Sequence, residues 1–215
     1  MKIIFNDTGK RFNREWIFRH FTYEFSIDNT YAIIGPNGSG KSTLLQVLSG
    51  GMDLSEGQGR WFSKNLPIES DCINEHVSIC APYLELIEEM TLYEFLKFHA
   101  TFKPFIKPLT IEKIISLIGL QNAANKQLRL YSSGMKQRVK LAQAIFSAVP
   151  IVLLDEPCTN LDVEGIQLYH QLINENRKNR LLIISSNDTE EYSFCENKIN
   201  ISDFKTTTAD LQSIN

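Results

Sequence analysis

The stretch Gly35-Pro36-Asn37-Gly38-Ser39-Gly40-Lys41-Ser42-Thr43 decides the fold, because it fits the pattern G-x-x-x-x-G-K-[ST] of a phosphate-binding loop. A short apolar run, Tyr31–Ile34, precedes the loop and predicts a strand. Apolar residues over Ser42–Ser49 follow it and predict a helix. The pattern is specific when it lies between a strand and a helix. The sequence therefore predicts a nucleoside triphosphate site at this loop.

The residue types of the loop suit the binding of phosphate. Glycines allow successive backbone N–H groups to point inward and approach phosphate oxygens, and the following helix adds its positive N-terminal end. Lys41 can reach the β- and γ-phosphates, and the Ser42 hydroxyl can be a ligand for Mg²⁺. The alternative is a glycine-rich turn that only starts a helix, and the flanking strand and helix argue against it. We expect every residue from Gly35 to Thr43 to line the nucleotide site.

Two carboxylates follow a second strand-like run, Ile151–Leu154. Ligands gather at the carboxyl ends of the strands of a parallel sheet, so Asp155 and Glu156 are expected near the phosphates. Asp155 is the expected second holder of Mg²⁺, through a water molecule. Glu156 is placed to orient or deprotonate the water that attacks the γ-phosphate. The alternative is a strand that ends in a solvated acidic turn, which the phosphate loop makes the weaker interpretation.

The remaining sequence surrounds these motifs with three kinds of pattern. Aromatic, partly alternating stretches such as Phe21–Phe25 predict antiparallel strands near the N-terminus. Helical periodicity extends from about residue 84 to residue 149. Strand signals return at 151–154 and 181–185, separated by the helix-like Val163–Lys178. The expected fold is α/β: a P-loop NTPase core with a parallel sheet, an antiparallel β subdomain at the N-terminus and an α-helical insert.

The chain is expected to form a single domain of 215 residues. Its expected parts are a catalytic core over about 1–82 and 150–203, a helical subdomain over about 84–149, and a short tail over 204–215. The first residues lack the long apolar region of a secretory signal, and no apolar run approaches the ~20 residues that span a bilayer. Any membrane role is therefore expected to come through another polypeptide.

Charge and cysteine content narrow the function classes. The chain has 22 basic and 25 acidic side chains, with a formal net charge of −3, which argues against a broad nucleic-acid surface. None of the four cysteines lies in a C-x-x-C pair. Reduced structural thiols are expected instead of a metal site.

A third motif separates the possible nucleotide-binding families. Ser132-Ser133-Gly134-Met135-Lys136-Gln137-Arg138 lies before the acidic pair and resembles the signature sequence of ATP-binding cassette (ABC) ATPases. A turn of small residues that opens a helix is also a possible anion site. In this family the segment completes the nucleotide site of an opposing subunit, and two cassettes sandwich two ATP molecules. The resemblance implies this role for Ser132, Ser133 and Gly134.

The resemblance extends over essentially the whole chain and implies further contacts. Asn160-Leu161-Asp162 matches the family's D-loop, which contacts the other subunit. Phe12 lies where the family stacks an aromatic ring on adenine, with Trp16 as the alternative, although either could be an ordinary strand residue. The helical insert matches the subdomain that meets a membrane partner. That contact is expected at Tyr83–Met90, where the apolar residues could equally pack internally.

Two positions depart from the family pattern. The family usually has Gln at the joint between core and insert, where the alignment places Tyr83. A phenol is a poor Mg²⁺ ligand at neutral pH because its pKa is ~10. The family also has His where this chain has Asn187. Asn can hydrogen-bond a phosphate oxygen but cannot carry charge. We expect a measurable but weak basal ATPase, because Lys41, Asp155 and Glu156 remain.

The resemblance implies an ATP-binding and ATP-hydrolysing subunit that energises a separate integral-membrane permease. ATP and Mg²⁺ are the expected cofactors, and a second copy of the chain is the expected partner on ATP binding. The expected location is the cytoplasm, on the inner face of the cell membrane through the permease, with no nucleic-acid partner. Two alternatives stay open: a hydrolysis-deficient module that ATP switches between assembly states, and a soluble family member outside transport. A small-molecule kinase would not explain the signature or the D-loop.

Overall fold

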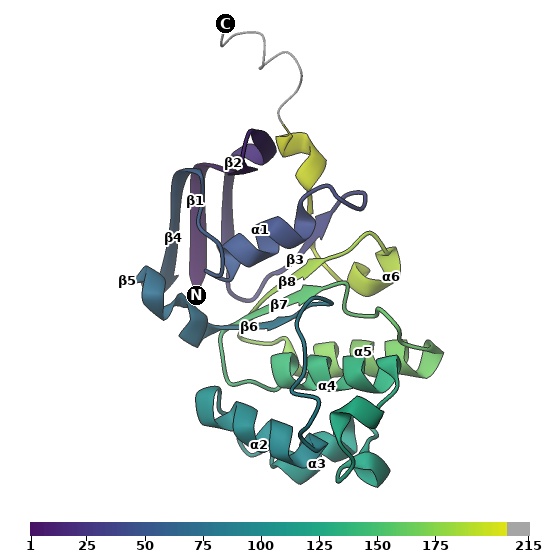
Figure 1. Ribbon diagram of the computed structural model, residues 1–215. Coiled ribbons are helices and arrows are strands. Elements are labelled where there is room, and N and C mark those ends of the chain that lie inside the picture. Colours follow the sequence, from purple (N-terminus) through teal and green to yellow (C-terminus); the bar gives the residue numbers. More distant parts are fainter. Residues whose placement is uncertain (206–215) are drawn as a thin grey trace, which may run out of the picture.

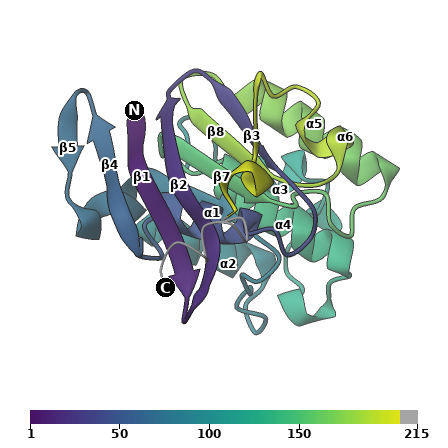
Figure 2. The same cartoon turned by 90° about the horizontal axis from the view of Figure 1, so that it is seen from above.

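A computed structural model describes residues 1–205, in which two β-sheets lie on either side of one helix (Figure 1). The antiparallel sheet has the order β2-β1-β4-β5, and Figure 2 shows these strands side by side. Their bounds are β1 (Lys2–Phe12), β2 (Glu15–Ser26), β4 (Glu56–Ser63) and β5 (Leu66–Ile68). The second sheet has the order β6-β7-β8-β3-β9 and is parallel throughout. Its strands are β3 (Thr30–Ile34), β6 (Val77–Cys80), β7 (Ile151–Asp155), β8 (Leu181–Ser185) and β9 (Asn197–Asn200).

The helices cover both faces of the parallel sheet. In Figure 1, α1 lies between the two sheets, α4 and α5 lie against the opposite face of the parallel sheet, and α2 and α3 lie beyond them. The helix bounds are α1 (Lys41–Leu48), α2 (Leu92–Phe102), α3 (Ile111–Leu117), α4 (Ser133–Ile145), α5 (Val163–Asn176) and α6 (Thr189–Tyr192). The predicted α/β fold with an antiparallel β part, a parallel core sheet and a helical insert is confirmed.

Buried aromatic residues alternate with exposed residues along the strands of the antiparallel sheet. Phe5, Phe21 and Phe25 are fully buried, and the ring of Phe5 lies edge-on to both of the others and to Trp61. Residues between them, such as Glu24, face solvent. The aromatic face of this sheet therefore packs on α1 and holds the phosphate-binding loop against the parallel sheet.

The parallel strands are apolar along their whole length because helices cover both of their faces. Every residue of β7 and β8 is buried. Leu153 and Ile183 belong to the core cluster beneath α1, whereas Leu154 and Ile184 belong to the cluster beneath α4 and α5. The carboxyl ends of these strands lie side by side, which brings distant parts of the sequence to one edge of the sheet.

The strands β4, β5, β6 and β9 were not predicted from the sequence. They are short or contain many polar residues, so no apolar run marks them.

The boundaries of the helical subdomain at about 84 and 149 remain a prediction, and α4 within them lies against β6. At the predicted tail, Phe204 packs edge-on against Phe21, with ring centroids 4.7 Å apart, and 206–215 lie outside the described residues. None of the described helices is long and apolar enough to cross a membrane.

His99 on α2 provides a test of the helical packing. Its Nε2 lies 2.8 Å from the hydroxyl of Ser147, and burial, with Lys103 nearby, lowers its pKa from 6.5 to about 4. Unfolded chains therefore take up this proton first as the pH falls, so stability is lost between pH 6.5 and about 4. Urea unfolding at pH 7.5 and 4.5 should show that His99→Gln, which keeps a hydrogen-bonding side chain, loses about 1–2 kcal/mol less than the wild type. Equal losses in the two proteins would contradict this account.

Candidate functional site

The phosphate-binding loop lies between β3 and α1, and a hollow opens on it. The hollow is lined by loop residues and by two residues from elsewhere in the sequence, Ile17 and Glu156. The loop residues that line it are Asn37, Gly38, Gly40, Lys41, Ser42 and Thr43. The structure thus brings together the two motifs that the sequence separated by more than a hundred positions.

The backbone of the loop needs glycine where it meets β2. Gly40 is the N-cap of α1 and has φ 106°, in the left-handed region that side chains disfavour. A Cβ at Gly40 would lie 2.4 Å from Cγ2 of Ile17. No larger residue fits between the loop and this strand, so the amides at the start of α1 stay open toward the hollow.

The ammonium group of Lys41 is held inside the loop. Its Nζ donates to the carbonyl oxygens of Gly35 at 2.9 Å and Pro36 at 3.2 Å, and the residue is 5% exposed. Within residues 1–205 it forms no ion pair with a carboxylate. A buried cation without a counter-ion, beside the N-terminus of a helix, is the arrangement expected of an anion site.

The acidic pair lies at the carboxyl end of β7, as the sequence predicts. Asp155 is 2% exposed, and its Oδ1 has no hydrogen-bond partner in the described part of the chain. Glu156 has φ 44°, and its backbone N–H donates to the carbonyl of Ser185 at 2.8 Å. A non-glycine residue in this region is strained, and such strain concentrates at functional sites. Glu156 lines the loop hollow.

These residues fit a hydrated divalent cation. The buried Asp155 oxygen without a partner and the hydroxyl of Ser42, which lines the loop hollow, are hard oxygen ligands of the kind that Mg²⁺ takes. The residues described here contain no group of three or more His, Cys, Asp or Glu side chains that could hold a metal. A cation at this site would therefore share its ligands with phosphate oxygens and water, as Mg²⁺ does in nucleotide sites.

The two positions that depart from the family pattern both lie at this edge of the sheet. The Nδ2 of Asn187 donates to Oδ1 of Asn37 in the loop at 3.1 Å. Burial raises the pKa of the Tyr83 phenol above 10, a hydrogen bond with Gln46 opposes the rise, and the negative charge of Asp155 adds to it. Tyr83 is thus neutral at physiological pH and lies close enough to Asp155 to feel its charge.

The predicted adenine contact is not part of the loop hollow. Phe12 is 46% exposed at the end of β1, with Nζ of Lys10 lying 5.3 Å from its ring centroid. Trp16, the alternative, contacts two guanidinium groups, Arg11 at 5.4 Å and Arg19 at 4.6 Å. Phe12 is therefore the freer of the two rings, and its role in stacking on adenine remains a prediction.

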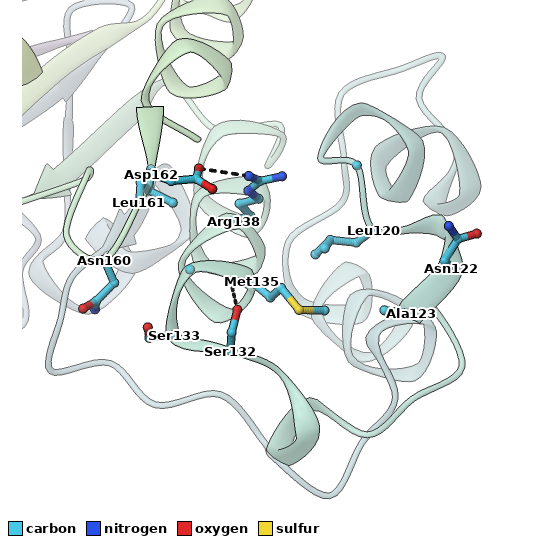
Figure 3. Close-up of a pocket in the computed structure, with 12 residues that line it drawn as sticks. Leu120, Asn122, Ala123, Ser132, Ser133, Met135, Arg138, Asn160, Leu161 and Asp162 are labelled. Carbon is cyan, nitrogen blue, oxygen red and sulfur yellow. Dashed lines mark hydrogen bonds and ion pairs between the residues drawn. The ribbon is translucent and has the colours of Figure 1, made fainter. Parts of the chain in front are cut away.

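The signature segment forms a second hollow, shown in Figure 3. Ser132 is the N-cap of α4, and its hydroxyl accepts a hydrogen bond from the backbone of Met135 at 3.2 Å. Arg138, one turn further, forms an ion pair with Asp162 at 3.3 Å. The lining includes Ser132, Ser133, Gly134 and the segment 160–162. This hollow shares no lining residue with the hollow at Lys41.

Comparison with known proteins settles the family. A family model described as ABC transporter matches residues 18–159. The chain belongs to this family. The cassette is 30% identical over 193 residues to the uncharacterized ABC transporter ATP-binding protein YybJ of Bacillus subtilis, covering 87% of this chain and 86% of the relative. It is also 30% identical to ABC transporter A family member 11 of Dictyostelium discoideum, but spans 22% of that longer protein.

A solved structure has the same fold. The dimeric structure of MJ0796, described as a bacterial ABC transporter cassette, superimposes with a TM-score of 0.75. The two chains are 19% identical, and the match covers 93% of this cassette and 95% of the other chain. At this level of identity the likeness concerns the fold alone.

Sequence reasoning missed three residues that connect the parts of the cassette. Ile17 lines the loop hollow, although nothing in the sequence of β2 marks it. Gln137, quoted within the signature, points inward and donates to the carbonyl of Pro157 at 2.7 Å. Glu191 is buried, which raises its pKa, and its Oε1 accepts from the backbone N–H of Cys158 at 2.7 Å. The last two contacts fix the segment that follows Glu156.

Proposed function

We propose that this cassette binds ATP with Mg²⁺ at the phosphate-binding loop, hydrolyses it slowly and thereby drives a separate membrane permease. The observation that carries the proposal is the buried Lys41 ammonium, without a carboxylate partner among residues 1–205, facing the same hollow as Glu156. A trianionic phosphate tail supplies the missing negative charge, and family membership supplies the ATPase class.

Each residue at the hollow has a proposed part. Free backbone N–H groups of the loop from Gly35 to Thr43 and the Lys41 ammonium hold the phosphates, and Ser42 and Asp155 would hold Mg²⁺. Bound Mg²⁺ would neutralise charge that develops on the phosphate oxygens. Glu156 orients the attacking water and accepts its proton. Asn187 donates to a phosphate oxygen once it leaves Asn37, and Phe12 stacks on adenine.

A second copy of the chain is the proposed partner in the ATP-bound state. The signature hollow and the loop hollow share no residue, so a head-to-tail pair would let Ser132, Ser133 and Gly134 of each copy close the nucleotide site of the other. The N-terminus of α4, whose first residue Ser133 is exposed, offers free backbone amides for this contact.

Ser133→Asp tests this pairing. An acidic residue in the first turn of α4 favours the helix in the monomer, but it would repel the phosphates of a nucleotide bound by the other copy. We expect ATP hydrolysis to fall by about tenfold with unchanged nucleotide affinity of the monomer. Ser133→Ala is the matched neutral control. Full hydrolysis by Ser133→Asp would contradict the head-to-tail arrangement.

The permease contact is proposed at Tyr83–Met90, and the structure divides this segment into two kinds of residue. Leu86 is 7% exposed and packs in the core cluster, as the internal-packing alternative predicts. Tyr83 and Ile87 are 45% and 39% exposed and remain available to a partner. Isolation of the tagged chain from native membranes should recover a protein with several membrane spans, and Ile87→Asp should reduce that recovery. Recovery of no such protein would argue against the transport role.

The second candidate function is a module that ATP assembles without turnover. Tyr83 and Asn187 favour it. The neutral phenol of Tyr83 does not reproduce the usual Gln, and the amide of Asn187 does not reproduce the usual His. Phosphate release from purified protein separates the two functions. Slow release that stops when EDTA removes Mg²⁺ supports the ATPase, whereas ATP-dependent dimerisation without any release supports the module.

A further inference from the structure

Two buried oxygen atoms without partners lie next to one another at the carboxyl edge of the parallel sheet. Asp155 ends β7 and Ser185 ends β8, and the two residues are paired in register. Asp155 is 2% exposed and Ser185 is fully buried. Neither Oδ1 of Asp155 nor Oγ of Ser185 has a hydrogen-bond partner within residues 1–205.

Strand alternation places both side chains on the α1 side of the sheet. Leu153 and Ile183, two positions earlier on the same strands, pack in the core cluster that contains Leu44 of α1. Side chains two positions apart on a strand share a face, so Asp155 and Ser185 also project toward this face. The helix on that face begins at Lys41 and continues with Ser42. Ser185 therefore lies at the metal side of the proposed nucleotide site.

A hydroxyl buried without a partner carries a desolvation cost. The rest of β8 is Leu and Ile, and a small apolar residue in place of Ser185 would avoid this cost. Ser78 on β6 shows the ordinary case, because its buried hydroxyl donates to the carbonyl of Ala144 at 2.7 Å. The Ser185 hydroxyl differs in having a neighbour, Asp155, that also lacks a partner.

We infer that Ser185 is a positioning residue for the hydrated Mg²⁺ ion, and that its hydroxyl holds a water molecule of the ion's shell beside Asp155. The inference rests on the proposed function, because it needs a cation at Asp155. Outer-shell partners of this kind fix the orientation of metal ligands. Ser185 touches neither nucleotide nor metal directly in this arrangement, so its effect is on metal affinity and not on the affinity for the nucleotide alone.

Ser185→Ala tests the inference with two measurements that do not depend on turnover. Electron paramagnetic resonance with Mn²⁺ and ADP should show Mn²⁺ affinity about tenfold weaker than in the wild type. Affinity for ADP in EDTA should not change. Thermal unfolding without ligands should give a Tm equal to or above that of the wild type, because the variant removes a buried hydroxyl that has no partner.

Ser78→Ala is the matched control, since it removes a buried strand hydroxyl that has a partner. It should lower the Tm of the ligand-free protein and leave Mn²⁺ affinity unchanged. If Ser185→Ala behaves like Ser78→Ala, the hydroxyl is structural and the inference is overturned. If the wild type itself binds no Mn²⁺ with ADP, the proposed function fails as well, so the two failures are distinguishable.

Discussion

Glu156→Gln should lower phosphate release by about 100- to 1,000-fold while nucleotide affinity stays close to that of the wild type. The carboxylate is at the loop hollow, on a strained turn fixed by its N–H bond to the Ser185 carbonyl. Gln has nearly the same shape but cannot accept the proton of the attacking water. The variant would still bind ATP and form the closed dimer, but it would not cleave the γ-phosphate.

The same variant should accumulate as a dimer with trapped nucleotide. In the proposed cycle hydrolysis resets the ATP-bound pair, so a cassette that binds ATP but does not cleave it should remain a closed dimer. Light scattering after gel filtration in MgATP measures the dimer, and a phosphate assay measures turnover. Glu175→Gln, an exposed position on α5, is the matched control and should leave both unchanged. Undiminished turnover in Glu156→Gln would show that another group handles the water.

Much of the site could be predicted because its chemistry needs particular residues in a fixed order along the chain. The loop from Gly35 to Thr43 lies between a strand and a helix as expected, and Asp155 and Glu156 lie at the end of a buried strand. Ligands of a parallel sheet bind at the carboxyl ends of its strands, so residues that share a ligand gather at one edge of the sheet. That rule places the acidic pair beside Lys41 without knowledge of the intervening segments.

The parts that could not be predicted depend on long-range packing. Ile17 contacts the loop because β2 passes beside Gly40 in the folded chain. The sequence of a strand does not indicate which distant segment lies beside it. Ser185 has no local signal, since a serine at the end of an apolar strand is ordinary until its missing partner is seen. The segment Tyr83–Met90, predicted to contact a permease, could not be resolved from sequence for the same reason. Leu86 packs inside the protein, whereas its neighbour Ile87 is exposed.

Lys41→Ala is expected to have the second large effect. Among residues 1–205, Nζ of Lys41 donates hydrogen bonds only to the backbone carbonyls of Gly35 and Pro36, which carry no net charge. A phosphate tail would replace neutral acceptors by anionic oxygens, and charge-assisted bonds in a buried site are the strong ones. Loss of the ammonium should therefore weaken MgATP binding by at least about 100-fold. Lys113→Ala, an exposed lysine on α3, is the matched control and should bind normally.

Nucleotide binding through Lys41 is tested most directly by an equilibrium titration of MgATP against the folded wild type, Lys41→Ala and Lys113→Ala, with circular dichroism to verify that all three are folded. We predict Mg²⁺-dependent binding by the wild type and by Lys113→Ala, and at least about 100-fold weaker binding by Lys41→Ala. Equal affinity in the wild type and Lys41→Ala, or no affinity in the wild type, would contradict it.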